Sequence, residues 1–376
     1  MGKFGKKVEI QLNPLNYNCC LAGESGIGKS TLIKEMCEKL AGDDGYLALD
    51  IGREDGHSAI NGIVSEQIED WAKFVEVTDD IIENKEEEYP NLKVIIIDTY
   101  DEFCNIAEKE IIRQHNRKNP DKRTDTINGA FGGFGKGLDK TIDLMLDKLW
   151  ELKKVGVSFI IVAHVRKKDI DDVMTQEQYS VLTSNVSQRY FNAIKTKLHF
   201  LGLAYIDREI VKEKTGKKNV VSGVDILKGQ IVSESRIINF RDDTYSIDSK
   251  SRFANIVNRI PFDSDELIKA MTDAILAEHN KSGESIEVTK EKQDKEAKEA
   301  EKVAAEYSKA RKKNKIDEEK NEGLIAIIQE KFTDASVEIK TEAKAIMTEY
   351  GFAKFSEDNI PTEALERIVE ILNKAA

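Results

Sequence analysis

The sequence predicts an α/β fold in which a mainly parallel central sheet is followed by a charged helical linker and a small C-terminal helical bundle. Three observations support this prediction. From the start of the chain to about residue 260, short apolar runs alternate with amphipathic stretches, which is typical of a parallel sheet covered on both faces by helices. A glycine-rich segment at 23–31 joins an apolar run to an amphipathic stretch. From residue 281 the composition changes to mostly Glu, Lys, Ala and Asp.

Composition and charge indicate a protein with a packed core and one unusually charged segment. The 376 residues, 40% hydrophobic and 34% charged, suggest two domains, or one large α/β domain with an appendage. The net charge of −12 argues against a chain coated in nucleic acid but leaves room for a local groove. No apolar run approaches the length of a membrane span, and the basic start at 1–7 lacks a secretion signal. We expect a cytoplasmic protein with no membrane partner and four buried free cysteines.

The glycine-rich segment is a complete phosphate-binding loop of the G-x-x-x-x-G-K-[ST] type. Its residues, all expected to contact nucleotide, are Gly23, Glu24, Ser25, Gly26, Ile27, Gly28, Lys29, Ser30 and Thr31. The glycines let backbone N–H groups wrap around a triphosphate. Lys29 supplies a charge to the β- and γ-phosphates, and the Ser30 hydroxyl is expected to ligate Mg²⁺. The segment therefore predicts a nucleotide-binding P-loop protein.

The other elements of the core follow from hydrophobic periodicity. Strands are predicted at Val8–Leu12, Asn18–Ala22, Tyr46–Asp50, Val94–Asp98, Ser158–His164, Leu198–Asp207, Gly229–Val232 and Ile237–Arg241. A helix at 29–40 follows the loop, and its N-terminus adds partial positive charge toward the phosphates. The strongest other helix is predicted at Gly137–Val155, where apolar residues form one stripe. These elements together predict a nucleotide-binding core domain at 1–262.

The C-terminal third of the chain has a different character. Residues 281–320 carry pairs such as Glu291 and Lys295 at helix-supporting spacing without a sustained heptad. A solvated single helix and a semi-disordered linker both fit this pattern better than a coiled coil. Three short amphipathic helices are predicted after it, at 324–332, 337–350 and 362–372. We expect a helix and charged linker at 263–320 and a small helical domain at 321–376.

The run Val94–Asp98 predicts the second element of a nucleotide site. Four β-branched residues end in Asp98, about seventy residues after the loop. Such a strand delivers a carboxylate to the Mg²⁺ shell beside the phosphates. Asp101 and Glu102 follow as second candidates for metal or water contacts, although acidic residues are also common at a helix N-terminus.

Two further strand ends carry candidate catalytic side chains. The strand Tyr46–Asp50 leads into an acidic turn, where Glu54 is expected to orient the attacking water, with Asp50 behind it. An ordinary acidic turn remains an alternative. The buried strand at 158–164 ends in His164, where a neutral imidazole could donate a hydrogen bond to a γ-phosphate and lose it after hydrolysis.

The order of these motifs resembles the RecA-like recombination ATPases, and most closely the short phage members associated with single-strand annealing. The resemblance covers about residues 15–255, and the family has a polar sensor, usually Gln or His, at the position of His164. It implies ATP bound between neighbouring subunits of a ring or filament. It also implies that residues 165–185 and the loop before the long helix face a DNA channel or groove.

The composition of the first proposed DNA segment suits this role. The first is locally basic at 115–123 and continues into two aromatics within a glycine frame at 129–136. Basic side chains that track phosphates, beside aromatics that stack on bases, suit sequence-tolerant binding of single-stranded DNA. A long surface loop whose Phe side chains pack on the core fits the same residues. The DNA-binding candidates are Arg117, Lys118, Arg123, Phe131, Phe134, Lys136, Arg166 and Lys167.

One late segment is similar to the Lys-x-Arg element of hexameric helicases. Lys250 and Arg252 would, by this resemblance, reach the γ-phosphate of a neighbouring subunit, a task that suits the charged, planar guanidinium. The glycine and proline that usually follow this element are absent, and a solvated basic turn fits as well. Arg189, Lys195 and Lys197 are rival inter-subunit candidates.

We therefore expect an ATPase that acts on single-stranded DNA in phage recombination or replication as a homo-oligomer. Lys29, Glu54, Asp98 and His164 are the expected catalytic residues, and Ser30 and Asp98 the expected Mg²⁺ ligands. The C-terminal region is expected to recruit a partner such as a single-strand-binding protein. Two alternatives remain: a helicase- or packaging-type motor of the same fold, and a nucleotide-gated assembly protein that DNA does not stimulate.

Overall fold

The computed structural model describes residues 8–53, 56–171, 178–218, 225–241, 251–352, 355 and 360–374. The chain divides into two compact units, Met1–Ala304 and Ala305–Ala376. The division falls inside the segment 263–320 that the sequence predicts as helix and linker. The predicted strand Val8–Leu12 is wrong, because no strand forms there. The side chain of Gln293 instead bonds the backbone of this segment, at Ile10 and Leu12.

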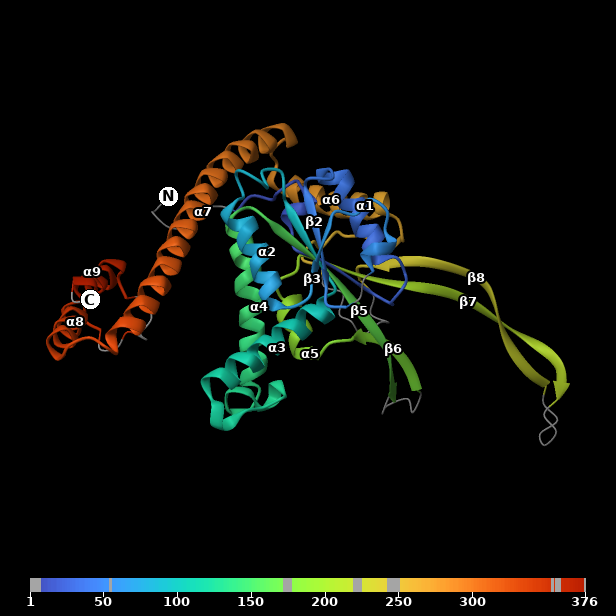
Figure 1. Ribbon diagram of the computed structural model, residues 1–376. Helices are drawn as coiled ribbons and strands as arrows, with labels where there is room; N and C mark the ends of the chain where they lie inside the picture. Colours follow the sequence, from blue (N-terminus) through green and yellow to red (C-terminus); the bar gives the residue numbers. More distant parts are fainter. Residues whose placement is uncertain are drawn as a thin grey trace. The chain divides into compact units, whose positions relative to one another are not determined.

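A mainly parallel sheet forms the centre of the first unit (Figure 1), which confirms the predicted fold class. Its order is β3 (Ser65–Ile68), β2 (Tyr46–Ile51), β4 (Val94–Asp98), β5 (Ser158–Asp171), β1 (Cys19–Gly23), β7 (Phe200–Lys218), β8 (Asp225–Asn239) and β9 (Arg259–Pro261), with β6 (Gln178–Ser184) paired to β5. The six neighbouring strands β3, β2, β4, β5, β1 and β7 pair in parallel. Strands β6, β8 and β9 pair antiparallel to their neighbours. Strand β5 thus separates β1, which enters the phosphate-binding loop, from β4.

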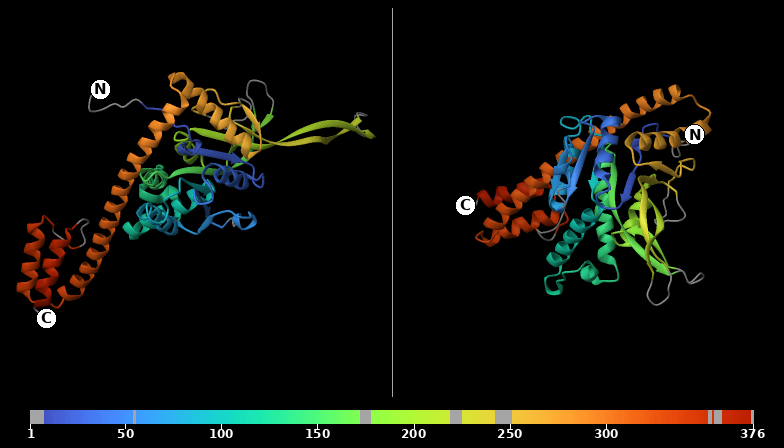
Figure 2. Two further views of the ribbon diagram at one scale, coloured as in Figure 1. Left: turned by 90° about the horizontal axis from the view of Figure 1, so that it is seen from above. Right: turned by 90° about the vertical axis from the view of Figure 1, so that its right-hand side faces the viewer.

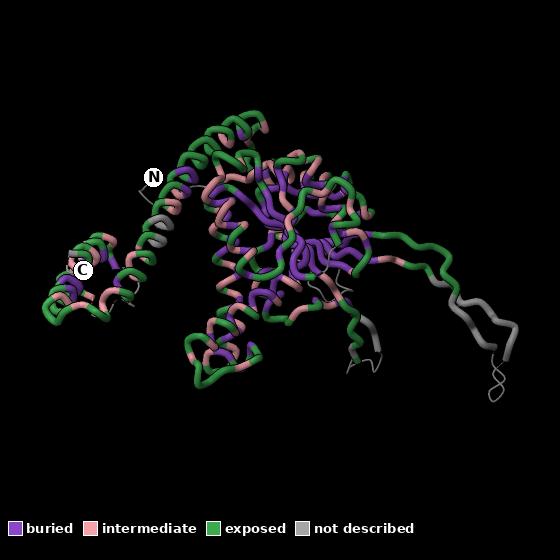
Figure 3. The backbone as a smooth tube through the Cα atoms, viewed as in Figure 1, coloured by how far each residue is buried: buried purple, intermediate pink, exposed green. Residues whose placement is uncertain are grey.

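The residues of the central strands are mostly buried (Figure 3), and helices lie on both faces of the sheet (Figure 1). On one face α1 (Lys29–Ala41) and α6 (Ser264–His279) share a core with alternate residues of the strands, such as Leu21 and Ile96. The intervening strand residues, such as Ile95, are buried on the other face. The remaining helices of the core are α2 (Trp71–Glu83), α3 (Tyr100–Lys118), α4 (Lys136–Lys154) and α5 (Gln188–Lys195). Short 3₁₀ turns lie at Pro14–Asn16, His57–Ala59, Pro120–Lys122, Ile127–Gly132 and Asn280–Ser282.

Two antiparallel hairpins extend beyond the parallel part of the sheet. Strand β5 continues past His164 to Asp171 and pairs with β6, so a hairpin occupies much of the segment expected as a DNA loop. Strands β7 and β8 form a longer ribbon, which both Figure 1 and the left view of Figure 2 show extending past the flanking helices. A register shift between Glu209 and Ile210 marks a bulge in it. The two short strands expected at 229–241 are one continuous strand, β8.

The second unit is helical, as the sequence predicts. Helix α7 (Ile286–Phe332) belongs to both units, and α8 (Val337–Glu349) and α9 (Thr362–Lys374) complete the second. Its own apolar core includes Ile328, Met347 and Leu365. The charged segment therefore takes the helical one of the two predicted forms over the residues that the structure describes.

Candidate phosphate-binding and catalytic site

The phosphate-binding loop lies between the end of β1 and the start of α1, at the carboxyl edge of the sheet. Gly23 pairs with His164 of β5 and Ala204 of β7, and a Cβ at this position would lie 2.6 Å from the carbonyl oxygen of Ala204. Gly28, with φ +104°, is the N-cap residue before α1, and as a glycine it has no side chain to cap the helix. The first N–H groups of α1 therefore face the position where an anion would bind.

The Lys29 side chain is held against the loop. Its ammonium donates to the carbonyl oxygens of Gly23 at 3.2 Å and Glu24 at 2.9 Å, and the residue is 5% exposed. These contacts fix the loop around a positive charge and place that charge beside β5.

Two buried carboxylates lie on neighbouring strands beside the loop. Asp50 of β2 and Asp98 of β4 are register partners, and each is buried within a run of buried residues. Asp98 is 6% exposed, and its Oδ2 lies 3.0 Å from Nε2 of His57. The backbone N–H of His57 donates to Asp50 Oδ2 at 3.5 Å. The predicted metal carboxylate is therefore joined by a histidine that the sequence analysis did not single out.

His164 lies where the sequence predicted it, at the carboxyl edge between β1 and β4. Its backbone N–H donates to Asp101 Oδ2 at 3.0 Å, and its Nδ1 lies 3.8 Å from the same oxygen. Burial and the nearby charge of Lys29 lower the pKa of His164, while Asp101 and Asp98 oppose this shift. The neutral imidazole required of a γ-phosphate sensor is therefore favoured. Asp101 itself links the first turn of α3 to β5.

The remaining acidic candidates have different surroundings. Glu54 lies outside the described residues, so its role stays a prediction. Glu102 packs against Gly52, which has φ +84°, and accepts a hydrogen bond from Asn105 at 3.0 Å. Its contacts are therefore those of a residue that joins α3 to the end of β2.

Two residues missed by the sequence analysis support the outer side of the loop. The Arg236 guanidinium of β8 donates to the carbonyl oxygen of Ile27 at 3.2 Å. Phe262 donates its backbone N–H to the Arg236 carbonyl at 3.0 Å, and its ring would lie 3.5 Å from a Cβ at Gly28. Both residues lie more than 200 positions from the loop in sequence, so no local pattern could have identified them.

The DNA-binding candidates occupy two projections that extend toward the same side in Figure 1 and in the right view of Figure 2. One is the end of α3 with the following turns and the start of α4; the other is the β5–β6 hairpin. The exposed candidates are Arg117, Lys118, Arg123, Phe134, Lys136, Arg166 and Lys167. Lys167 Nζ lies 3.8 Å from the carboxylate of Glu24 in the phosphate-binding loop. The hairpin and the loop therefore contact each other.

The two predicted stacking aromatics differ in exposure. Phe134 is 100% exposed, with φ +54°, between glycines that also have positive φ. Phe131 is half-buried, packs edge-on against His115 with ring centroids 5.2 Å apart, and lies under Lys140. The alternative of core packing thus describes Phe131, whereas Phe134 faces solvent.

Two of the inter-subunit candidates, Arg252 and Arg189, have contacts that the structure describes. Lys250 lies outside the described residues. Arg252 lies at the amino edge of the sheet, where its guanidinium donates to the Thr196 carbonyl at 2.5 Å and its N–H to the His199 carbonyl at 3.0 Å. Arg189 forms an ion pair with Asp139 of α4.

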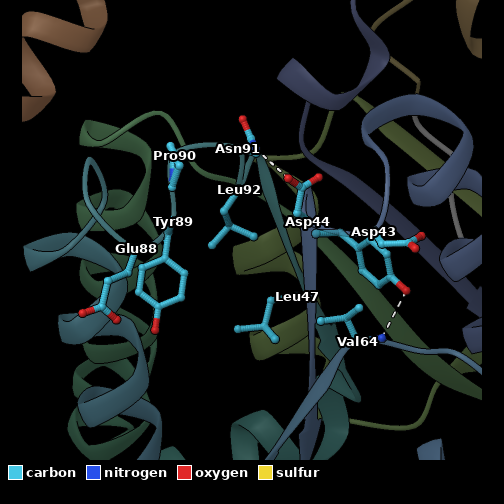
Figure 4. A pocket seen from close by; sticks show the side chains of 10 residues that line it. Asp43, Asp44, Leu47, Val64, Glu88, Tyr89, Pro90, Asn91 and Leu92 are labelled. Carbon is cyan, nitrogen blue, oxygen red and sulfur yellow. Dashed lines mark hydrogen bonds between the residues drawn. The ribbon is translucent and has the colours of Figure 1, made fainter.

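A pocket of about 290 Å³ lies near the opposite edge of the sheet from the loop (Figure 4). It is lined by residues that lead into β2 and β4 and by the first residues of β2, among them Asp43, Asp44, Leu47, Tyr89 and Leu92. Because the phosphate-binding loop follows the carboxyl end of β1, this pocket is not part of the site described above.

The donor set of the site fits a nucleotide-bound Mg²⁺. A hydroxyl (Ser30) and a buried carboxylate (Asp98) are oxygen ligands of the kind that Mg²⁺ prefers, and the ion usually completes its shell with phosphate oxygens and waters. Within the described residues, no three His, Cys, Asp or Glu side chains form a metal cluster. In the same part of the chain, we find no helix whose length and apolar character would let it cross a membrane.

Comparison with known proteins identifies a family for most of the first unit. A family model described as an AAA domain matches residues 15–253, and no curated protein matches the chain. Among solved structures, an ATPase from the type III secretion system of pathogenic bacteria is 13% identical, with a TM-score of 0.30 over 50% of this chain and 51% of that one. A KaiC-like protein from the archaeon Pyrococcus horikoshii is 11% identical, with a TM-score of 0.29 over 59% and 85%.

The chain spans about half the length of the secretion ATPase. The family match, by contrast, covers more than half of the present chain and includes the loop, Asp98 and His164. The chain therefore belongs to this AAA-domain family and carries the phosphate-binding loop of a P-loop NTPase.

Proposed function

We propose that this ATPase binds single-stranded DNA in a nucleotide-dependent manner, as a homo-oligomeric ring or filament in phage recombination or replication. In this proposal it acts in the host cytoplasm. One observation carries the proposal. Strand β5 runs without interruption from His164, beside the phosphate-binding loop, to Arg166 and Lys167 on an exposed hairpin. A change at the γ-phosphate can therefore reach a basic surface through a single strand.

The proposal assigns one task to each residue of the site. Lys29 and the N-terminus of α1 hold the phosphates, while Ser30 and Asp98 hold Mg²⁺, which neutralises charge on the phosphate oxygens when bound. Glu54 orients the water that replaces the leaving ADP on the γ-phosphorus. His164 donates a hydrogen bond to the γ-phosphate, and release of phosphate breaks that bond.

Coupling to DNA would use the contact between the loop and the hairpin. Glu24 follows the first glycine of the loop, and its carboxylate lies 3.8 Å from Lys167. A bound triphosphate adds negative charge near this pair and competes for the Lys167 ammonium. The hairpin would then change position with nucleotide state, together with the DNA-binding residues that it carries.

The DNA surface in this proposal combines exposed cations with one aromatic. Arg117, Lys118, Arg123, Lys136 and Arg166 contact phosphates, and Phe134 stacks on a base. Lys250 and Arg252, with Arg189, Lys195 and Lys197 as rivals, are proposed to approach ATP bound to the neighbouring subunit. The C-terminal unit is proposed to recruit a single-strand-binding protein.

Fluorescence anisotropy of a labelled oligothymidine tests this function. Affinity should differ at least several-fold between the ATP-bound state and the ADP-bound state in the wild type, and Lys29→Ala should lose this difference. Lys167→Ala should reduce the difference, whereas a change at Lys73, a half-buried, ion-paired lysine of α2, to Ala should leave it unchanged. Equal affinity in all nucleotide states, or no binding, would contradict the proposal.

One observation favours a second candidate, a nucleotide-gated assembly protein. The unit Ala305–Ala376 has a core of its own and is suited to hold a partner independently of DNA. Hydrolysis that is measurable but indifferent to DNA would support this function. A motor of the same fold would be recognised by directional strand displacement.

A further inference from the structure

His57 occupies a position that none of the roles above accounts for. It begins the short turn His57–Ala59 after β2 and is 6% exposed. Its Nε2 lies 3.0 Å from Asp98 Oδ2, and its backbone N–H donates to Asp50 Oδ2 at 3.5 Å. A single residue therefore contacts both buried carboxylates at the carboxyl edge.

The contact with Asp98 favours the tautomer of the neutral His57 ring in which Nε2 is the donor. An ionised carboxylate only accepts, so Nε2 carries the proton and donates it. In the neutral ring, Nδ1 is then an acceptor. Nδ1 is buried and has no hydrogen-bond partner among the described residues. A buried polar atom without a partner is costly, and such atoms are often satisfied by a water or an ion.

We propose that His57 is a positioning residue for Mg²⁺ at this site. It holds Oδ2 of Asp98, which fixes the orientation of the carboxylate and directs its other oxygen to the ion. Partners of this kind, which orient a metal ligand without touching the metal, typically change metal affinity about 10–100-fold when removed. The inference rests on the proposed role of Asp98 as a Mg²⁺ ligand.

A purely structural role for His57 makes a different prediction. If His57 only satisfied a buried carboxylate, its loss would lower stability without any specific effect on metal. The chain offers a matched control in His279, which is 2% exposed, bonds Thr289 through Nε2 at 2.7 Å, and also has a partnerless Nδ1. His279 lies at the end of α6, away from both carboxylates.

The experiment measures binding of a fluorescent ATP analogue by the full-length protein, first in EDTA and then across a Mg²⁺ titration. His57→Phe keeps the ring volume but cannot donate, and His57→Asn keeps an amide too short to reach Asp98. In both variants, the Mg²⁺ concentration that gives half of the full change in analogue binding should rise about 10-fold or more. The affinity for the analogue measured in EDTA should not change. His57→Gln, whose amide nitrogen reaches the position of Nε2, should restore the wild-type Mg²⁺ dependence. His279→Phe should behave as wild type.

The outcomes separate this inference from the proposed function. Wild-type Mg²⁺ dependence in both His57→Phe and His57→Asn would overturn the positioning role and leave the nucleotide site intact. Equal loss in His279→Phe would assign the effect to stability and would also overturn it. Failure of the wild-type protein to bind the analogue, or binding indifferent to Mg²⁺, would instead contradict the proposed ATP and Mg²⁺ site itself.

Discussion

Side chains at the phosphate site are held by neighbours within their own chain. The Lys29 ammonium is bonded to two loop carbonyls, and Asp98 to His57. The backbone of His164 is bonded to Asp101. Groups fixed in this way need little reorganisation when charge develops on a reacting phosphate.

The first residue-scale prediction concerns Glu54. Glu54→Gln keeps the size of the side chain but removes the carboxylate that orients water, so turnover should fall at least 100-fold while ATP binding is retained. Single-turnover hydrolysis and analogue binding, measured together, check this. Asp101→Asn is the control, since Asp101 is bonded to the backbone of His164. Wild-type hydrolysis in Glu54→Gln would move the assignment to another acid.

A second residue-scale prediction follows from His199. Burial, with the charges of Arg252 and Lys153, lowers its pKa from 6.5 to about 4, and its Nδ1 accepts the Asn18 N–H at 3.2 Å. Between these two pKa values the unfolded chain binds the proton more tightly, so stability is present above pH 6.5 and falls as pH drops toward 4.

Between pH 6.5 and pH 4 the free energy of unfolding should fall by about 1–2 kcal/mol through His199. The value is kept this low because the half-exposed ring is partly screened by solvent. Urea unfolding of wild type and His199→Asn at pH 7 and pH 5 measures it. The pH dependence should be smaller in the variant by this amount. Identical pH dependence in the two proteins would show that His199 does not titrate in this way.

At the scale of elements, the two Phe residues of the segment between α3 and α4 are expected to have different roles, one in DNA binding and one in packing. Phe134→Ala should weaken binding of single-stranded DNA by about 1–3 kcal/mol without loss of stability, because the ring is fully exposed. Phe131→Ala should instead lower stability, because this ring packs on His115. Anisotropy and thermal unfolding of both variants test the pair. Unchanged affinity in Phe134→Ala would remove the aromatic from the DNA surface.

Elements were predictable where a local pattern determines them. Strand β4 has the predicted bounds, because four β-branched residues before an acid leave little alternative to a buried strand. The length of the β7–β8 ribbon was not predictable, since its outer part lacks an apolar alternation. The segment Val8–Leu12 alternates like a strand, but bonds from Gln293, 283 residues away from Ile10, take the place of a strand partner.

The same limit applies to the site. Gly23–Thr31, Asp98 and His164 lie in one place because each lies where a strand leaves the parallel part of the sheet, and the carboxyl ends of such strands share one edge. His57 and Arg236 were missed because their contacts with Asp98 and Ile27 join segments 41 and 209 residues apart. Only the folded chain shows these pairs.

At the scale of the whole molecule, the two units should respond separately to core mutations. Leu365 is 0% exposed in the core of the C-terminal unit. Leu365→Ala should therefore lower the free energy of unfolding of this unit by about 2–5 kcal/mol. Hydrolysis in the first unit should be unaffected. Val337→Ala, at a residue that is 80% exposed, is the matched surface control. Calorimetry with parallel ATPase assays checks this, and a joint loss of both transitions would show a single cooperative unit.

The central claim is that hydrolysis at the phosphate site and DNA at the two projections are coupled. Steady-state ATP hydrolysis by the full-length protein, with and without single-stranded DNA and with Lys29→Ala as the blank, tests it most directly. We predict strong stimulation by DNA that is reduced in Phe134→Ala and in Arg166→Ala. Hydrolysis that is measurable in the wild type but unchanged by DNA would contradict the claim.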